Sequence, residues 1–521
     1  MTTDQHCNDT VKGRYSKFLT DRDPYEKRAE EASLLTIPAL FPRKGHTANS
    51  ILPTPFQSIG ARGVNTLASK LLLALLPPNN PFFKLQIDEF TITELSADPK
   101  AKTQIENALA SIERDTVNSI ETSSLRVDLF ECLKHLIVTG NSLLYLPPDG
   151  SGGRVFPLSK YVVKRDPSGN VLEIITLESL SNHTLTPELQ ALLSKSKEDC
   201  EPGGKALELY THIERCDGMW EVKQELEGIV VPDSEGTYPL DNCPWIPIRF
   251  TKIDNEDYGR GFVEEYLGDL YSLEGLSQAI VEGAAAAAKI LFLVKPGGQT
   301  KIKTIASAKN AAVVQGDAAD VTVLQAQKFY DFRTAQETAD RITERLSAAF
   351  MLTSAVQRQA ERVTAEEIRL LAKELEESLG GIYSVLSQEL QLPMVRVIMA
   401  NLTRKGKLPK LPKNIVKPMI VTGLDALGRG YDREALVSFL QTLTAVLGSD
   451  VMKTYIEVSE AITRLAVSSG IDTKGLVKPP EVVAQEQQQQ QQMAMMQQLG
   501  PNAVNAVGKM AAQAQQQQPT Q

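Results

Sequence analysis

Cysteine is scarce in this sequence, with five among 521 residues, at positions 7, 132, 200, 216 and 243. An odd number at irregular spacing predicts no disulfide framework, and no C-x-x-C pair suggests a zinc site. Free thiols are typical of proteins made in a reducing compartment, so we expect synthesis in one.

Positive charge is also in deficit, because 55 lysines and arginines face 64 aspartates and glutamates, for a net charge of −9. Such a surface repels phosphates on average, which argues against general binding to nucleic acid. Any contact with nucleic acid is therefore expected to be local.

Long apolar runs are missing as well. The best candidate near the start, "LASKLLLALLPP" at 67–78, contains Lys70 and ends at two prolines. It is about half as long as a membrane span. The first residues, "MTTDQHCNDTVKGRYSKF", lack the apolar core of a signal peptide. We expect a soluble chain without membrane insertion.

Catalytic motifs are absent too. There is no phosphate-binding G-x-x-x-x-G-K-[ST], since "PGGQTK" at 296–301 has the wrong spacing, and no H-E-x-x-H, G-x-S-x-G or strand-linked G-x-G-x-x-G. His212 and Cys216 fall in a predicted strand, where a spacing of four is too long for a compact metal site. His135 is interpreted as a satisfied, partly buried histidine. We therefore expect no enzyme, no cofactor and no metal.

Helical patterns dominate residues 21–146. Asp23, Pro24 and Glu26 suit an N-cap, a first-turn proline and a reciprocal N3 carboxylate. Apolar residues at steps of four in 56–76 predict a second helix, whose glycines, Gly60 and Gly63, favour close packing. Two more helices are predicted at 101–122 and 126–139, ending at Gly140, with "NSLLYL" as a strand.

Residues 151–253 change to β patterns. "KYVVKRDPSGNVLEIITLE" alternates around a turn, and "ALELYTHIERCDGMWEVKQELEGIVV" does so around Asp217 and Gly218. Both predict hairpins in a small antiparallel region.

Helix returns from residue 262 and runs into five consecutive alanines. Either this is an ordinary packed helix, or it is crowded among copies of itself, because alanine lets helices approach closely. A compact α/β excursion is predicted at 291–328 and a helix at 334–351. After "TSAVQRQAERVT", Thr364 and Glu367 form a capping box for another helix, with a bend at Gly380–Gly381. Short helices are expected at 425–478, and a glutamine-rich tail beyond 484.

Four long blocks carry a resemblance to a known family: "DRDPYEKRAEEASLLTIPALFP", "TPFQSIGARGVNTLASKLLLALLPP", "YGRGFVEEYLGDLYSLEGLSQAIVEG" and "TSAVQRQAERVTAEEIRLLAKELEESLGGIYSVLSQELQLPMVRV". Over about residues 14–478 the chain resembles the portal protein, or head-to-tail connector, of short-tailed bacteriophages of the autographivirus (podovirus) type. The blocks occur in the same order with similar spacing. The β region and the tail resemble the family least.

The resemblance implies a predominantly helical α+β fold with portal architecture that assembles into a ring, usually of twelve copies. Its parts would be a wing at 1–261, a stem helix at 262–290, a clip at 291–330, a returning stem helix at 331–352, a tunnel loop at 353–363, a long helix leading to the crown at 364–424, the crown at 425–480, and a disordered tail at 481–521.

The resemblance also implies the function. Such a ring sits at one capsid vertex of the virion, nucleates head assembly, and passes viral double-stranded DNA during packaging and ejection. Its partners would be further copies, duplex DNA, the terminase large subunit, scaffolding and major capsid proteins, and tail adaptor and internal core proteins. Synthesis would take place in the bacterial host cytoplasm. The alternative is a non-portal structural or internal virion protein acting as a helical scaffold.

Three sets of candidate site residues follow from the resemblance. The tunnel loop would contact DNA through Gln357, Arg358, Gln359 and Arg362. The stem would line the channel through Glu282, Lys289, Asp340 and Glu344. Neighbouring subunits would pack on Ala284, Ala285, Ala286, Ala287 and Ala288.

An acidic channel has a physical reason, because strong attraction to phosphate would impede a sliding duplex. The stem carboxylates could instead form a solvated outer face, or inter-subunit ion pairs with Lys289, Arg341 and Arg345. The loop arginines can bind phosphate oxygens without reading sequence. They could also pair with nearby glutamates, at positions 361, 366 and 367, which would neutralise the positive charge of the loop.

Overall fold

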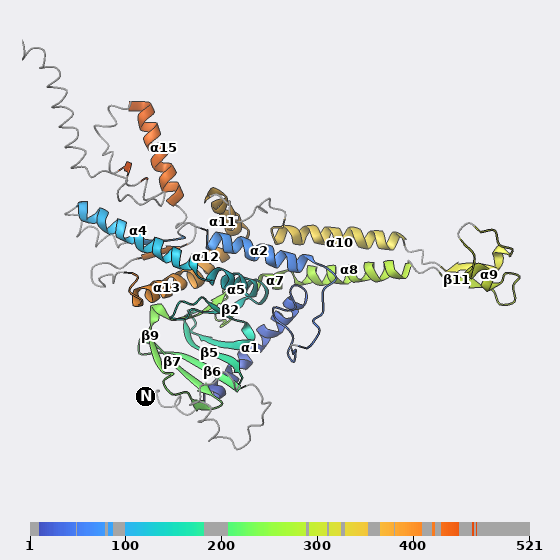
Figure 1. Cartoon of the computed structure of the whole chain (residues 1–521), viewed down its shortest axis with the longest axis horizontal. Coiled ribbons are helices and arrows are strands. Elements are labelled where there is room, and N and C mark those ends of the chain that lie inside the picture. Colours follow the sequence, from blue (N-terminus) through green and yellow to red (C-terminus); the bar gives the residue numbers. More distant parts are fainter. Residues whose placement is uncertain are drawn as a thin grey trace, which may run out of the picture. The chain divides into compact units, whose positions relative to one another are not determined.

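The computed structural model describes residues 10–47, 49–78, 82–86, 99–181, 207–287, 291–309, 312–324, 329–352, 365–379, 381–408, 419–422 and 429–447, with positions 461, 462 and 465. Two compact units account for the chain, one formed by 1–97 and 111–426, the other by 98–110 and 427–521. Helices prevail over strands (Figure 1), which confirms the predicted α+β class.

The described helices are α1 (Val11–Leu34), α2 (Ile59–Leu75), α4 (Pro99–Thr122), α5 (Leu125–Thr139), α7 (Phe262–Glu265), α8 (Leu267–Ala287), α9 (Ile302–Ala306), α10 (Phe329–Ala349), α11 (Ala365–Leu379), α12 (Ile382–Leu386), α13 (Leu392–Arg404) and α15 (Arg429–Leu447). The described strands are β1 (Phe83–Gln86), β2 (Asn141–Tyr145), β3 (Arg154–Phe156), β4 (Tyr161–Arg165), β5 (Val171–Leu180), β6 (Leu207–Cys216), β7 (Met219–Leu226), β8 (Ile229–Val230), β9 (Gly236–Pro239), β10 (Trp245–Arg249), β11 (Leu291–Val294), β12 (Val321–Leu324) and β13 (Met419–Thr422).

Helix α1 begins at Val11, so the predicted start at Asp23 is wrong and Pro24 lies inside the helix. A proline there removes one backbone hydrogen bond and normally breaks a helix. Tertiary contacts outweigh that cost here. The carboxylate of Glu225 on β7 accepts the N–H of Val11 at 2.8 Å, and Arg22 donates to the first carbonyl of β4 at 2.8 Å.

Helix α2 confirms the leucine stripe, because Leu67, Leu71 and Leu75 are all buried. The prediction that its glycines mark close packing is confirmed too. A Cβ placed on Gly63 would lie 2.6 Å from the ring of Phe350, which follows α10. Only a residue without a side chain allows the two segments to approach this closely.

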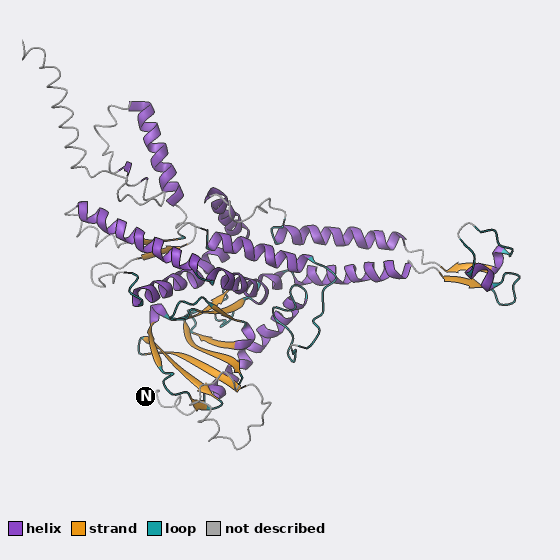
Figure 2. Ribbon diagram, in the orientation of Figure 1, coloured by secondary structure: helices purple, strands orange, loops and turns teal. Residues whose placement is uncertain are grey.

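The β region forms two antiparallel sheets, one in the order β4-β5-β6-β7-β8 with β9 also on β7, the other in the order β10-β2-β3. Both predicted hairpins are present, and Asp217 and Gly218 adopt the positive φ values, 44° and 79°, that a tight primed turn needs. Helix α1 packs along the larger sheet (Figure 2). Val11 and Tyr15 bury their side chains against Val162, Ile175 and Tyr210 there.

A long helix with a bend at Gly380–Gly381 was predicted for 364–424, and its continuation to 424 is wrong, because strand β13 lies within that range. Helix α11 ends at Leu379, and Gly381 takes a left-handed φ of 88°, which confirms the bend. A π-helical turn then spans Ser387–Gln391 and α13 ends at Arg404. Pro393 lies at the start of α13, where a regular helix would place its ring against an earlier carbonyl. The π-helical turn at Ser387–Gln391 lies just before this proline, and π-helical turns are a known cause of local departures from regular α-helix geometry.

Strand β13 pairs antiparallel with β1, with Phe83 opposite Thr422 and Gln86 opposite Met419. Neither strand was predicted from the sequence. In the other unit, α15 spans nineteen residues, longer than the short helices expected after 425. The predicted glutamine-rich tail lies outside the described residues.

Candidate functional site

Two long helices, α8 and α10, lie side by side (Figure 1). The helix predicted at 262–290 is divided at Tyr266 into α7 and α8. The buried side chains of the pair are Leu270, Leu273, Ala339, Ile342 and Leu346. Arg345 donates to Asp269 across the pair at 2.8 Å. This arginine therefore has an ion-pair partner within its own chain.

A glycine leaves room for an aromatic ring of α10 farther along α8. A Cβ on Gly283 would lie 2.2 Å from the ring edge of Phe332 on α10. The glycine directly before the alanine run therefore allows the ring of Phe332 to lie directly against the backbone of α8.

The carboxylates predicted to line a channel are exposed on this pair: Glu282, Asp340 and Glu344. Glu282 and Asp340 each accept a hydrogen bond, 2.9 Å long, from the glutamine four residues earlier. Lys289 lies outside the described residues. A further acidic residue of α8, Glu274, is engaged elsewhere, because it accepts the backbone N–H groups of residues 56 and 57.

The alanine run is open on its described part. Ala284, Ala285 and Ala286 are exposed and Ala287 is half-buried, while Ala288 lies outside the described residues. Val281, one turn earlier, is 54% exposed. A helix surface of small and apolar side chains is thus left free for another element.

The excursion between the two helices is the compact α/β unit that was predicted. Strands β11 and β12 pair, and Asp320 accepts the N–H of Thr300 at 3.2 Å. The second aspartate, Asp317, caps the turn at Ala319. The basic side chains are instead exposed: Lys295, Lys301, Lys303 and Lys309.

The predicted loop contacts, Gln357, Arg358, Gln359 and Arg362, all lie outside the described residues. The helices predicted on either side are present as α10 and α11.

The sequence profile of the bacteriophage head to tail connecting protein family matches residues 8–477. The chain belongs to this family.

Curated portal proteins are similar over most of their length. The portal protein of Enterobacteria phage T3 is 43% identical over 91% of this chain and 89% of its own. That of Escherichia phage T7 is 42% identical over 98% and 95%, and that of Enterobacteria phage SP6 is 33% identical over 82% of both chains.

The chain therefore has the function of a portal protein: it connects the head and the tail of a bacteriophage. The family consists of structural proteins, and its place is the capsid vertex of the virion. The alternative of a non-portal scaffold is therefore wrong. Among the described residues, no helix is both long and apolar enough to cross a membrane.

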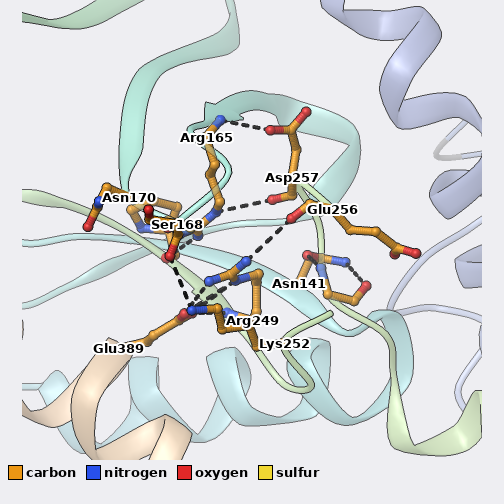
Figure 3. Close-up of polar contacts among 12 residues, drawn as sticks. Asn141, Arg165, Ser168, Asn170, Arg249, Lys252, Glu256, Asp257 and Glu389 are labelled. Atoms are coloured by element: carbon orange, nitrogen blue, oxygen red, sulfur yellow. Dashed lines mark hydrogen bonds and ion pairs between the residues drawn. The ribbon is translucent and has the colours of Figure 1, made fainter. Parts of the chain in front are cut away.

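A buried ion pair, which was not predicted from the sequence, joins the smaller sheet of this connector to the π-helical turn. Arg249 on β10 is 2% exposed and donates to Glu389 through Nη2 at 2.6 Å and Nε at 3.2 Å (Figure 3). Its backbone N–H also donates to Glu389, at 3.0 Å.

The segment that leads into α7 is fixed beside this pair. Asp257 accepts the N–H of Arg165 at 2.7 Å, and Asn141 exchanges two hydrogen bonds with Gly259 (Figure 3). Burial lowers the pKa of Arg165 to about 10, while the carboxylate of Glu389 acts against that shift. A Cβ on Gly140 would lie 2.4 Å from the backbone of residue 260. Helix α5, the sheet and the entrance to α7 therefore form one tightly fitted junction.

The two histidines considered in the sequence have structural surroundings. His212 lies on β6 as predicted, with Nε2 2.7 Å from Glu173, which also pairs with Arg14. His135 is 3% exposed, deeper than expected, and its Nδ1 has no hydrogen-bond partner. Burial lowers the pKa of His135 to about 4. Within the described ranges, no cluster of three or more possible ligands could hold a metal ion.

Proposed function

We propose that copies of this chain form a ring of twelve around a channel for viral double-stranded DNA. Family membership carries the proposal, and the exposed alanine surface of α8 supports it. A surface of small side chains suits close contact between helices of neighbouring subunits, where each residue can pack without large displacement. Synthesis in the host cytoplasm precedes assembly with scaffolding, capsid and internal core proteins.

In this proposal α8 and α10 form the stem. The wing comprises 1–261, the clip 291–330, the tunnel loop 353–363, the segment toward the crown 364–424, and the crown 425–480. The carboxylates that line the channel are Glu282, Asp340 and Glu344. Their exposure on the free sides of the helix pair supports this role.

The clip is the proposed docking point for the terminase large subunit and later for the tail adaptor. Its chemistry supports contact with a protein. Ile302 is 67% exposed between two exposed lysines, Lys301 and Lys303, and the clip's aspartates are used in its own turns. Apolar side chains flanked by ammonium groups suit an acidic partner with apolar contacts.

Electron microscopy of the purified protein tests ring formation. Rings with a central hole are expected, whereas monomers or filaments would contradict the proposal. The same preparation is expected to lack ATPase activity, since no phosphate-binding loop is present.

The tunnel loop is tested with Arg358→Ala combined with Arg362→Ala in assembled heads. Planar guanidinium groups bind phosphate oxygens, and such contacts weaken as salt rises. Packaging is expected to begin normally, while DNA is lost more readily before the tail attaches, most of all at high salt. A double variant of Lys17→Ala with Lys223→Ala, two exposed lysines of the wing, serves as control and is expected to retain packaged DNA. Undiminished retention in the arginine variant would refute the role of the loop.

A further inference from the structure

Lys70 is the one charged side chain in the apolar run of α2, and it is 4% exposed. A buried ammonium group is costly unless it has hydrogen-bond partners or a counter-ion. The leucines at 67, 71 and 75 show that this helix has ample apolar packing without it. The position of the lysine therefore calls for a specific partner.

That partner is the end of α10. The N–H of Leu352 donates to the carbonyl of Ser347 at 2.8 Å, and the N–H of Met351 to that of Ala348 at 3.1 Å. These are the two bonds of a Schellman cap, which places its penultimate residue in the left-handed region. Glycine normally takes that position, yet here it is Met351, with a φ of 55°.

Lys70 stabilises this unusual turn. Its Nζ donates to the carbonyl of Met351 at 2.9 Å. The bond brings a positive charge to the negative end of the α10 dipole, where a cation is favourable. Phe350 anchors the same turn, because its buried ring lies against Gly63 of α2 and Phe262 of α7.

Helix α11, on the other side of the connection, also packs on α2. Burial lowers the pKa of Lys70, and the carboxylate of Glu374 on α11 opposes that shift by electrostatic attraction. Residue 352 precedes and residue 365 follows the connection that contains Arg358 and Arg362. Lys70 is therefore bonded to the end of α10 and lies on the helix against which α11 packs.

We propose that Lys70 is a positioning residue, which ties the end of α10 to α2, the helix on which α11 also packs, and so fixes where the tunnel loop starts relative to where it ends. In the ring, this lysine sets the placement of the loop arginines without touching DNA. The functional part of this inference rests on the proposed role of the loop, whereas the positional part does not.

Limited trypsin digestion of the purified full-length protein tests the positional part. Trypsin cuts after Arg358 and Arg362, and mass spectrometry measures both products against cleavage after Lys301 and Lys303 in the clip. Lys70→Met keeps the aliphatic stem and removes the charge. Cleavage in the loop is expected to rise several-fold, with cleavage in the clip unchanged.

Tyr383→Phe is the matched control, because it also removes a hydrogen bond to α2, from the Tyr383 hydroxyl to the carbonyl of Ala74 at 3.1 Å. General loosening of α2 would raise loop cleavage equally in both variants and would overturn the proposal. Unchanged loop cleavage in Lys70→Met would overturn it as well. Should that variant fail to fold, Glu374→Gln weakens the electrostatic attraction that favours the charged form of Lys70 and is expected to raise loop cleavage by a smaller factor.

Assembled heads test the functional part. Lys70→Met is expected to lose packaged DNA sooner than Tyr383→Phe, as the double arginine variant does. Increased loop cleavage with normal DNA retention would support the positioning role and overturn the contact between loop and DNA.

Discussion

Replacing Glu389 with leucine leaves the guanidinium of Arg249 buried without its counter-ion. Arg249 is 2% exposed, and Glu389 accepts hydrogen bonds from its Nη2, its Nε and its backbone N–H. Removing one partner of a buried pair costs about 3–5 kcal/mol. A backbone donor loses its acceptor as well, which costs about 1–3 kcal/mol on its own. The two effects overlap, so we expect the free energy of unfolding to fall by about 4–5 kcal/mol in Glu389→Leu.

Three further variants separate the contributions. Glu389→Gln keeps one acceptor oxygen and should cost roughly half as much. Arg249→Met should cost less than Glu389→Leu, because the remaining carboxylate is 18% exposed and still accepts the backbone N–H. Combining Arg249→Met with Glu389→Leu should restore part of the loss, since no buried charge is then left alone.

Intrinsic fluorescence during urea unfolding is a suitable assay. The chain has two tryptophans, Trp220 on β7 and Trp245 on β10, and both are buried in the β region. Their signal therefore follows the part of the protein that the ion pair holds. A midpoint for Glu389→Leu equal to that of the unmodified protein, or lower stability in Arg249→Met than in Glu389→Leu, would refute the reasoning.

Further predictions concern close packing, acid and assembly. Gly63→Ala should lower the free energy of unfolding, measured in urea, by about 1–2 kcal/mol, because the fully buried Phe350 cannot move away from the added methyl group. Gly283→Ala should be nearly neutral, because its methyl group meets the movable edge of the half-buried Phe332 ring. Equal losses would contradict this. Burial lowers the pKa of His135 to about 4 in the folded protein, below its ordinary value of about 6.5 in the unfolded chain. The unfolded chain therefore binds a proton first as pH falls, so the free energy of unfolding decreases between about pH 6.5 and pH 4. His135→Leu should accordingly lose about 2 kcal/mol less than the unmodified protein between pH 7 and pH 4.5; identical pH profiles would argue otherwise. Ala286→Leu should impair ring assembly by about 1–3 kcal/mol per site through overpacking, and normal rings in micrographs would mean that the run faces open space.

Local signals in the sequence predicted much of the fold. The leucine stripe of α2, the Asp217–Gly218 turn and the helix end at Gly140 each depend on neighbouring residues alone. Gly63 also indicated close packing, although its partner, Phe350, could not be identified from spacing. The start of α1 was missed because a proline rule was applied without the distant carboxylate of Glu225 that caps the helix.

Long-range partnerships explain the rest. Lys70 was interpreted only as an interruption of an apolar run, although a lone charge within a buried stripe is itself a signal that a partner exists. The Arg249–Glu389 pair joins residues far apart in the chain, and no periodic pattern connects them. For the candidate site, the helix pair was predicted and confirmed, whereas the role of the loop residues stays a prediction.

The pairing of β1 with β13 has a consequence for how the chain is made. Strand β1 must wait for a partner encoded about 330 residues later. At roughly 5–20 residues per second, synthesis takes on the order of 20–60 s to supply it. The last carbonyls of α2 wait as well, for the side chains of Tyr383 and Gln391. A ribosome-bound chain thus exposes the unpaired edge of β1 and the uncapped last carbonyls of α2 until most of the chain has been synthesised. The folded subunit becomes available only after that point.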